Sequence, residues 1–151
     1  MLRAAQRLPY IALGVLFAAM VALLTIELLL RNIVGSSIDW YDEVSRLLFV
    51  WCVFLGAAVG IRDRTHYSVT LFTHSVSEPA RRRLEIIADV IVVVIALVLL
   101  KQSLSLMLIE RHQLLSVTRL SAGWVDASVA VSSALMVMYA IANIVDLRVR
   151  R

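Results

Sequence analysis

The chain has 151 residues, of which 61% are hydrophobic, and its mean hydropathy is +0.87, whereas a soluble domain is only about 45–50% apolar. Its net charge of +4 does not predict nucleic-acid binding, because the arginines stand between long apolar runs rather than along one face. The single cysteine, Cys52, lies in an apolar run and excludes a disulfide framework, a Cys-rich metal site and dithiol chemistry within the chain. This composition predicts an all-α integral membrane protein in which residues 1–151 form a single four-helix membrane domain.

The first apolar run extends from Pro9 to Leu30, and it is long enough to cross about 30 Å of hydrocarbon as a helix. Arg3 and Arg7 precede it, as basic residues precede a secretory signal. The run is longer than the apolar part of such a signal, and no clear cleavage site follows it. We therefore predict an uncleaved transmembrane helix over about residues 9–30.

The second apolar run, Leu47 to Ile61, is too short to cross the membrane by itself. We predict that its helix begins earlier, near Trp40, so that a short interfacial helical extension precedes the second span. The predicted span covers about residues 41–61.

The residues before this second run support an early helix start. Asp39 is placed to cap the helix, and Asp42 and Arg46 have the i,i+4 spacing of a favourable ion pair. Trp40 and Tyr41 then lie at the membrane interface, where aromatic side chains concentrate.

The third span is predicted over about residues 82–106, around the apolar stretch 84–100. Arg81, Arg82 and Arg83 precede the apolar stretch, where they fix topology and are suited to anionic lipid headgroups. Lys101 follows Leu100, so it needs a position near the outer face, a nearby acid or a snorkelling side chain. The sequence does not decide among these.

The fourth span is predicted over about residues 124–145, and the orientation follows from counting cations on alternate sides. One side holds ten: Arg3, Arg7, Arg62, Arg64, Arg81, Arg82, Arg83, Arg148, Arg150 and Arg151. The other side holds five: Arg31, Arg46, Lys101, Arg111 and Arg119. We therefore expect four transmembrane helices with both termini in the cytoplasm.

Two acidic residues fall within predicted spans, where an ionised group costs at least about 2.5 kcal/mol. Glu27 stands one turn before Arg31, so pairing between them near the outer interface is the expected arrangement. Asp89 shares a helix stripe with Arg82 and Glu85, and we expect it to snorkel towards the basic cluster. A proton or cation site facing a water-filled cavity is the alternative for either acid.

Small residues recur on one face of the second predicted helix. Cys52, Gly56 and Gly60 are spaced i, i+4 and i+8, which lets another helix approach closely. The sequence does not distinguish packing against the chain's own helices from packing against a partner protein. Trp51 lies on another face of the same helix.

No enzyme activity, cofactor or metal site is expected. His66, His74 and His112 fall in predicted loops or at helix ends, whereas a membrane haem would need histidines that face one another within the bundle. No histidine pair has metal-ligand spacing, and no serine or cysteine has an evident base beside it.

An ordered series of motifs resembles a known family. The series comprises Leu30-Arg31, Trp40 to Glu43, Arg46 to Trp51, Phe54 to Ala58 and Arg62 to His66. In order and spacing it is similar to the small membrane subunit, DctQ-like, of tripartite ATP-independent periplasmic (TRAP) transporters.

The chain departs from the family pattern at two places. The family often has an aspartate a few positions after the histidine, which residues 66–70 lack, and prolines before the last helix, which residues 117–123 lack. These departures affect the detail of the loops.

The resemblance implies a subunit of a bacterial inner-membrane symport system. It would work with a large TRAP membrane subunit that carries the substrate and sodium sites, and with a periplasmic substrate-binding protein that delivers an organic acid. Membrane lipids surround it, and no nucleic acid is involved. On this basis we expect the large-subunit interface to include Arg31, Trp40, Glu43, Arg46, Trp51, Gly56 and Gly60. Pairing of the charged members within the chain is the alternative.

Two competing functions are considered. One is a self-sufficient small proton-coupled transporter that uses Glu27, although this residue lies close to the end of its span. The other is a redox protein that binds haem or quinone, for which no histidine arrangement is evident.

Overall fold

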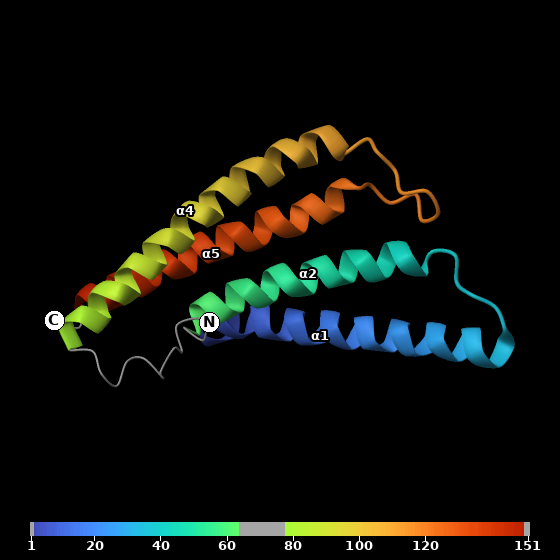
Figure 1. Cartoon of the computed structure of the whole chain (residues 1–151), viewed down its shortest axis with the longest axis horizontal. Helices are drawn as coiled ribbons and strands as arrows, with labels where there is room; N and C mark the ends of the chain where they lie inside the picture. The colour runs from blue at the N-terminus through green and yellow to red at the C-terminus, as the bar shows by residue number, and fades with distance from the viewer. Residues whose placement is uncertain (1, 64–77, 150–151) are drawn as a thin grey trace.

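The computed structural model describes residues 2–63 and 78–149, which form four long helices (Figure 1). They are α1 (Leu2–Leu29), which continues into the π-helical segment η1 (Leu30–Val34), α2 (Tyr41–Arg62), α4 (Glu78–Glu110) and α5 (Gly123–Val149). Outside the helices, an isolated antiparallel bridge joins Leu114 to Ser121. The predicted cytoplasmic arginines Arg64, Arg150 and Arg151 and the histidines His66 and His74 lie outside the described residues.

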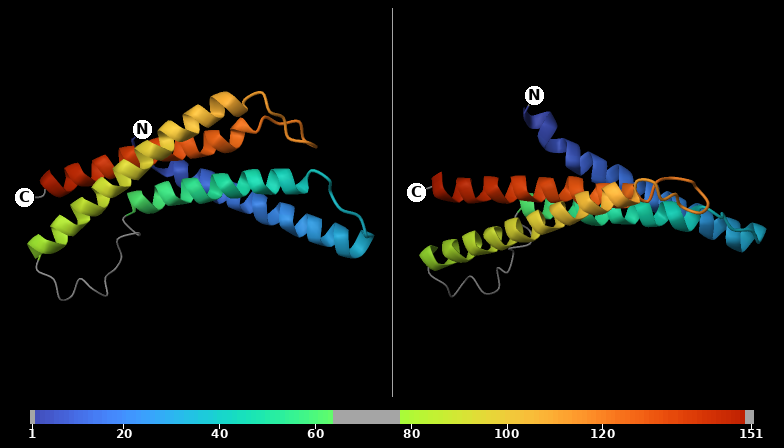
Figure 2. Two further views of the ribbon diagram at one scale, coloured as in Figure 1. Left: turned by 45° about the horizontal axis from the view of Figure 1, so that its top comes forward. Right: turned by 90° about the horizontal axis from the view of Figure 1, so that it is seen from above.

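The helices lie side by side in an open array rather than around one shared core. α1 packs on α2, α2 on α5, and α5 on α4 (Figure 1). Both termini lie towards one end of the array, and the connections 35–40 and 111–122 lie towards the other. Seen from above, α1 crosses the other helices obliquely and its first half diverges from them (Figure 2).

The buried core lies among α2, α4 and α5. Its members are mostly small: Ala58, Ile61, Ala96, Met136 and Ala140. Small side chains let helix axes approach closely, which matters in lipid because apolar burial against a helix gains little over burial against acyl chains. α1 contributes no residue to this cluster.

Three helices of the described chain are long and apolar enough to cross a membrane: Arg7–Ile33, Tyr41–Arg62 and Gly123–Leu147. They contain the predicted spans 9–30, 41–61 and 124–145, so the prediction of an all-α membrane protein is confirmed. The predicted span 82–106 lies within α4, which is not among the three.

The start of α2 agrees with the predicted residue but not with the predicted cap. α2 begins at Tyr41, its N-cap is Trp40, and no side chain caps it, because Asp39 stands one residue too early. A backbone hydrogen bond of 3.1 Å from Tyr41 N to the Ile38 carbonyl tightens the entry instead. The predicted ion pair between Asp42 and Arg46 is not formed in the structure, where both side chains are exposed.

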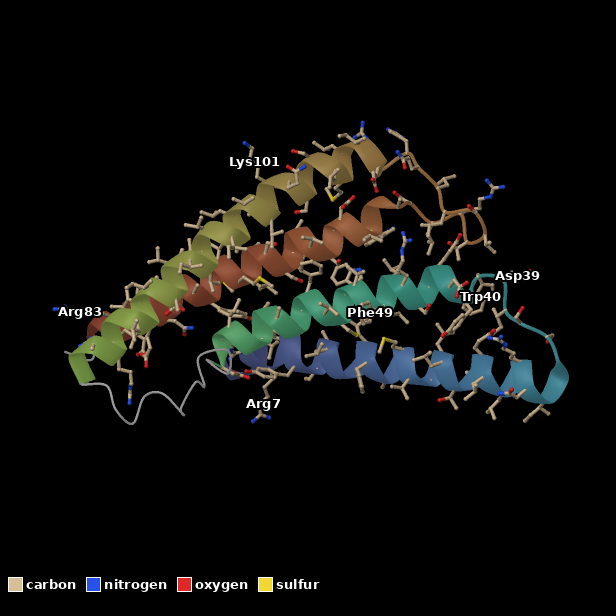
Figure 3. All side chains as sticks on the ribbon, viewed as in Figure 1. Arg7, Asp39, Trp40, Phe49, Arg83 and Lys101 are labelled. Atoms are coloured by element: carbon tan, nitrogen blue, oxygen red, sulfur yellow. The ribbon has the colours of Figure 1, made fainter. Side chains whose placement is uncertain are left out.

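Asp89 lies on the buried side of α4. It is only 1% exposed, and it stands one turn before Val92 and Val93, which pack against the buried cluster that includes Ala140. Its expected snorkelling towards the basic cluster stays a prediction. Lys101 is exposed and points away from the other helices (Figure 3).

The core packing gives a first prediction. Ala140 is fully buried, so Ala140→Leu should overpack the contact among α2, α4 and α5 and cost about 1–3 kcal/mol. Thermal unfolding of the purified chain in detergent measures this loss. Ala142→Leu, an exposed position on the same helix, is the matched control, and equal unfolding temperatures for the two variants would contradict the observed core.

Candidate functional site

Polar contacts between separate elements occur at the end of the array that holds the connections 35–40 and 111–122, which we call the outer end. The Glu43 carboxylate, in the first turn of α2, accepts hydrogen bonds from Val117 N at 3.0 Å, Thr118 N at 2.8 Å and Thr118 Oγ1 at 2.7 Å. Charge-assisted hydrogen bonds of this kind are roughly twice as strong as neutral ones. Glu43 therefore fastens the α4–α5 connection to the start of α2.

The α4–α5 connection is itself folded so that these donors converge. Leu115 N donates to the Leu120 carbonyl and Ala122 N to the Gln113 carbonyl, each at 2.8 Å. Arg119, at the turn, takes a left-handed conformation with φ of 58°. The resulting tight hairpin presents Val117 and Thr118 to Glu43. Glu43 thus bonds to donors of its own chain, and its place in the large-subunit interface stays a prediction.

Glu27 also bonds within the chain, but not to Arg31 as predicted. Its Oε2 accepts a hydrogen bond of 3.1 Å from Ile38 N, in the segment that leads into α2. The i,i+4 spacing alone does not reveal this partner, because the chain reverses direction after η1. The contact ties the outer end of α1 to the start of α2.

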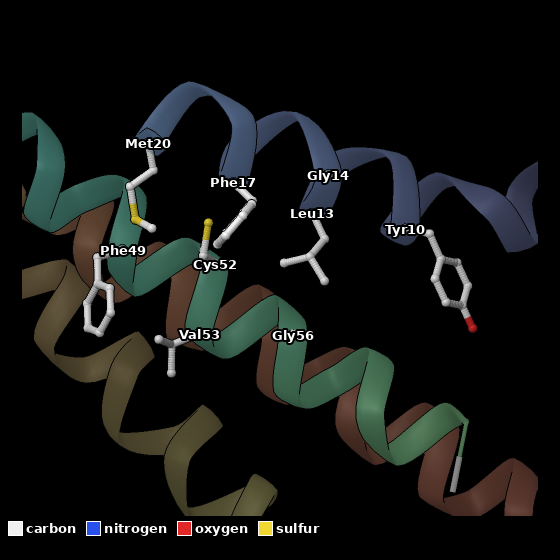
Figure 4. A pocket seen from close by; sticks show the side chains of 9 residues that line it. All are labelled: Tyr10, Leu13, Gly14, Phe17, Met20, Phe49, Cys52, Val53 and Gly56. Carbon is white, nitrogen blue, oxygen red and sulfur yellow. The ribbon is translucent and has the colours of Figure 1, made fainter. Parts of the chain in front are cut away.

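A groove follows the contact between α1 and α2, with a volume of about 530 Å³ (Figure 4). Its lining is apolar apart from the Tyr10 hydroxyl and the Cys52 thiol, and it includes Gly14 and Gly56. A Cβ at Gly56 would lie 3.8 Å from Leu13 Cδ1, whereas one at Gly14 would meet nothing within 4 Å. The predicted small-residue face thus contacts the chain's own α1 at Gly56 and remains open beside it.

A second apolar groove, of about 570 Å³, is lined by residues of α1, α2 and α5. Trp51 and Trp124 both contribute to it, together with Ala12 and Leu16. None of its lining residues is shared with the first groove. Trp51 and Gly56 therefore belong to different surfaces.

The inner end of α2 is held by aromatic and polar side chains of two other helices. The Arg62 guanidinium lies 5.1 Å from the ring centre of Tyr10 and 5.6 Å from that of Tyr139, and the Tyr10 hydroxyl donates to Asp63. Asn143 Nδ2 donates to the Ile61 carbonyl at 3.0 Å. Sequence reasoning missed this cluster, because its partners are far apart in the chain.

Buried serines were also missed. Besides Asp89, which the sequence singles out, four polar side chains on α4 and α5 are buried: Ser103, Ser128, Ser132 and Ser133. Ser128 Oγ donates to the Val125 carbonyl at 2.6 Å. Serine spacing along the last span, at positions 128 and 132, was the available signal.

The predicted partner-binding residues do not form one patch. Arg31, Trp40 and Arg46 are exposed towards the outer end, whereas Glu43 is engaged by the α4–α5 connection. Trp51 and Gly56 line separate grooves, and Gly60 is half-buried. In the described ranges no group of three or more His, Cys, Asp or Glu side chains is arranged to hold a metal ion.

Comparison with known proteins gives a family match over nearly the whole chain. The profile of the family described as tripartite ATP-independent periplasmic transporters, DctQ component, matches residues 4–150.

Individual relatives match over shorter stretches. The chain is 32% identical over 79 residues to the sialic acid TRAP transporter small permease protein SiaQ of Vibrio cholerae, covering 52% of this chain and 46% of the relative. It is 33% identical over 54 residues to the C4-dicarboxylate TRAP transporter small permease protein DctQ of Pseudomonas aeruginosa, covering 36% and 26%. It is 32% identical over 69 residues to the sialic acid TRAP transporter permease protein SiaT of Haemophilus influenzae, covering 46% and 11%. The match spans less than half the length of each of these relatives.

The Glu43 contact gives a second prediction. Glu43→Gln removes the charge that strengthens the hydrogen bonds from Val117 and Thr118, each worth about 1.5–3 kcal/mol when charged and about 1 kcal/mol when neutral. Hydrogen exchange at these two amides should therefore become roughly tenfold faster. Mass spectrometry of peptides that span the connection measures the rate.

Asp42→Asn is the matched control, because it removes the same charge from the same helical turn without touching the connection. If both variants changed exchange at residues 117 and 118 equally, the effect would belong to the charge of the helix terminus and not to the Glu43 contact.

Proposed function

The chain belongs to the DctQ component family of tripartite ATP-independent periplasmic transporters, and from this membership we propose that it is the non-catalytic small membrane subunit that braces a large transport subunit. The observation that carries the proposal is the open helix array. Among the long helices, α1 makes extensive contacts only with α2. No residue in its most apolar stretch is buried. A helix so little covered by its own chain is suited to being covered by another.

We propose that the groove between α1 and α2 receives a helix of the large subunit. Gly14 and Gly56 line this groove, and Gly14 has open space where a side chain would stand. Small residues permit close approach of a second helix backbone, which is a main source of helix association in lipid. The Trp51 groove offers a second apolar surface to the same partner or to acyl chains.

Four crossings are proposed, because α4 lies antiparallel to α5 along its length. Lys101 follows Arg83 by 18 residues, which is about 27 Å of helix at 1.5 Å per residue. Arg46 and Arg62 are 16 residues apart on α2, or about 24 Å. These pairs of cations suit the two edges of one hydrocarbon slab, with the side richer in arginine in the cytoplasm.

The relatives guide the proposed partners and substrate. In SiaT of Haemophilus influenzae the similar segment occupies 11% of a much longer permease chain, which supports a large membrane partner for the separate subunit. The names of the relatives specify sialic acid and C4-dicarboxylates, both carboxylic acids. We therefore propose symport of an organic acid, delivered by a periplasmic binding protein, across the bacterial inner membrane.

The self-sufficient transporter is less well supported. Glu27 lies at the outer end of its span and already accepts a hydrogen bond from Ile38 N. Moreover, the two apolar grooves have no charged side chain in their lining, so neither offers a path for a carboxylate substrate.

The groove gives a third prediction. Gly14→Leu should fill the groove without displacing α1, because nothing lies within 4 Å of the added Cβ. The variant chain should fold normally. When both subunits are expressed, the amount of large subunit that co-purifies should fall about tenfold, because a loss of about 1.4 kcal/mol in association free energy has that effect. Affinity purification followed by quantitative gel analysis measures the recovery.

The control for this experiment is Ala18→Leu, at an exposed position of α1 that lines neither groove. Full recovery of the large subunit with Gly14→Leu would contradict the proposed interface. Failure of the wild-type chain to recover any large membrane protein would contradict the subunit function itself.

A further inference from the structure

A polar pocket of about 750 Å³ lies at the outer end of the α1–α2 hairpin, separate from both apolar grooves. Its lining includes Glu27 and Arg31 from the end of α1 and η1, and Asp39 and Asp42 from the entry to α2. We propose that this pocket binds the headgroup of a zwitterionic aminophospholipid. The inference rests on the proposed function in one respect: the proposed orientation of the chain places the pocket in the outer leaflet of the membrane.

The position of the pocket fits a headgroup. The predicted apolar span of α1 ends at Leu30, and the pocket lining on this side extends from Leu24 to Arg31, so the pocket lies across the boundary between hydrocarbon and headgroups. Trp40 and Asp39 lie together at this end of the array (Figure 3). Trp40 is 42% exposed, as suits an aromatic side chain of the membrane interface.

The charges of the pocket suit a ligand with both signs. Three carboxylates, of Glu27, Asp39 and Asp42, share the lining with the Arg31 guanidinium. Asp39, Asp42 and Arg31 are exposed, and within residues 2–63 no ion pair closes Arg31 onto these acids. A primary ammonium next to a phosphodiester satisfies carboxylates and guanidinium together, through charge-assisted hydrogen bonds.

The excess of acids selects among lipids. With three carboxylates against one guanidinium, a headgroup that carries only a phosphate would meet net repulsion. A primary ammonium contributes three N–H donors to the acids, whereas a trimethylated ammonium has none. The pocket therefore favours an ethanolamine headgroup over both glycerol and choline headgroups.

Part of the pocket wall is apolar, although Thr25 and Ser37 also contribute to the lining. Leu24 and Leu28 follow the α1 side towards the membrane interior, where they can contact the first methylenes of the acyl chains. These two leucines suit the part of a lipid just below its headgroup. A soluble ligand would leave this wall without a partner.

The test uses the complex of this chain with its large subunit, purified in detergent and equilibrated with equal amounts of phosphatidylethanolamine, phosphatidylcholine and phosphatidylglycerol. Native mass spectrometry counts the lipid molecules retained. We expect phosphatidylethanolamine to be retained about tenfold over either other lipid, the effect of one charge-assisted contact of about 1.4 kcal/mol. Equal retention of the three lipids would overturn the proposal.

Variants locate the site. Arg31→Gln should reduce the retained phosphatidylethanolamine about tenfold, and Asp39→Asn with Asp42→Asn should abolish its advantage over phosphatidylglycerol. Arg111→Gln, in the other outer connection, is the control for loss of one cation and should change nothing. Unchanged selectivity in Arg31→Gln would overturn the proposal, even if the wild-type complex prefers the lipid.

Two further measurements separate the remaining explanations. If Arg31→Gln lowered binding of the periplasmic protein while lipid retention stayed constant, the pocket would be a protein-docking site and the lipid proposal would fail. Co-purification of the large subunit is recorded for each variant. Loss of lipid selectivity in wild-type complexes that assemble fully would overturn this inference alone, whereas absence of any complex would overturn the proposed function.

Discussion

The fold depends on close packing of small side chains around α5. In lipid each helix satisfies its own backbone hydrogen bonds, and apolar side chains gain little by leaving acyl chains for protein. Association of the helices must then come from close approach of their axes. Ala58 on α2, Ala96 on α4 and Ala140 on α5 allow this approach because their side chains occupy little space between the helices. The buried cluster joins these three helices and leaves α1 outside it, and this division shapes the rest of the molecule.

Because α1 shares no core, polar contacts at its two ends supplement its packing on α2. The Tyr10 ring lies against Arg62 and its hydroxyl donates to Asp63 at the inner end of α2, while Glu27 accepts from Ile38 N at the outer end. Between these points the crossing leaves grooves on different sides of the contact. The polar contacts thus hold the helix in a place where its apolar surface remains available.

Hydropathy predicted the helices well, since the runs of apolar residues required by 30 Å of hydrocarbon are visible in one dimension. α2 begins at Tyr41 and α5 at Gly123, within a residue of the predicted spans. The partners of the charged side chains were harder to predict. Spacing of i,i+4 assigned Glu27 to Arg31, yet its partner is Ile38 N, and Glu43 bonds residues more than 70 positions away. Such pairings depend on where connections reverse, which local spacing does not encode.

The distribution of polar groups distinguishes a structural subunit from one that transports a solute. A carboxylate that crosses a membrane needs a route lined by donors or cations, because leaving water without them costs several kcal/mol. In the described chain the two grooves have apolar linings, and the buried polar side chains lie on α4 and α5 outside them. Charged side chains at the outer end bind backbone groups or line a pocket at the interface. The surface that remains exposed within the membrane is apolar and grooved, so it binds through shape complementarity. A subunit built this way supports a transporter by contact with another helix or with lipid.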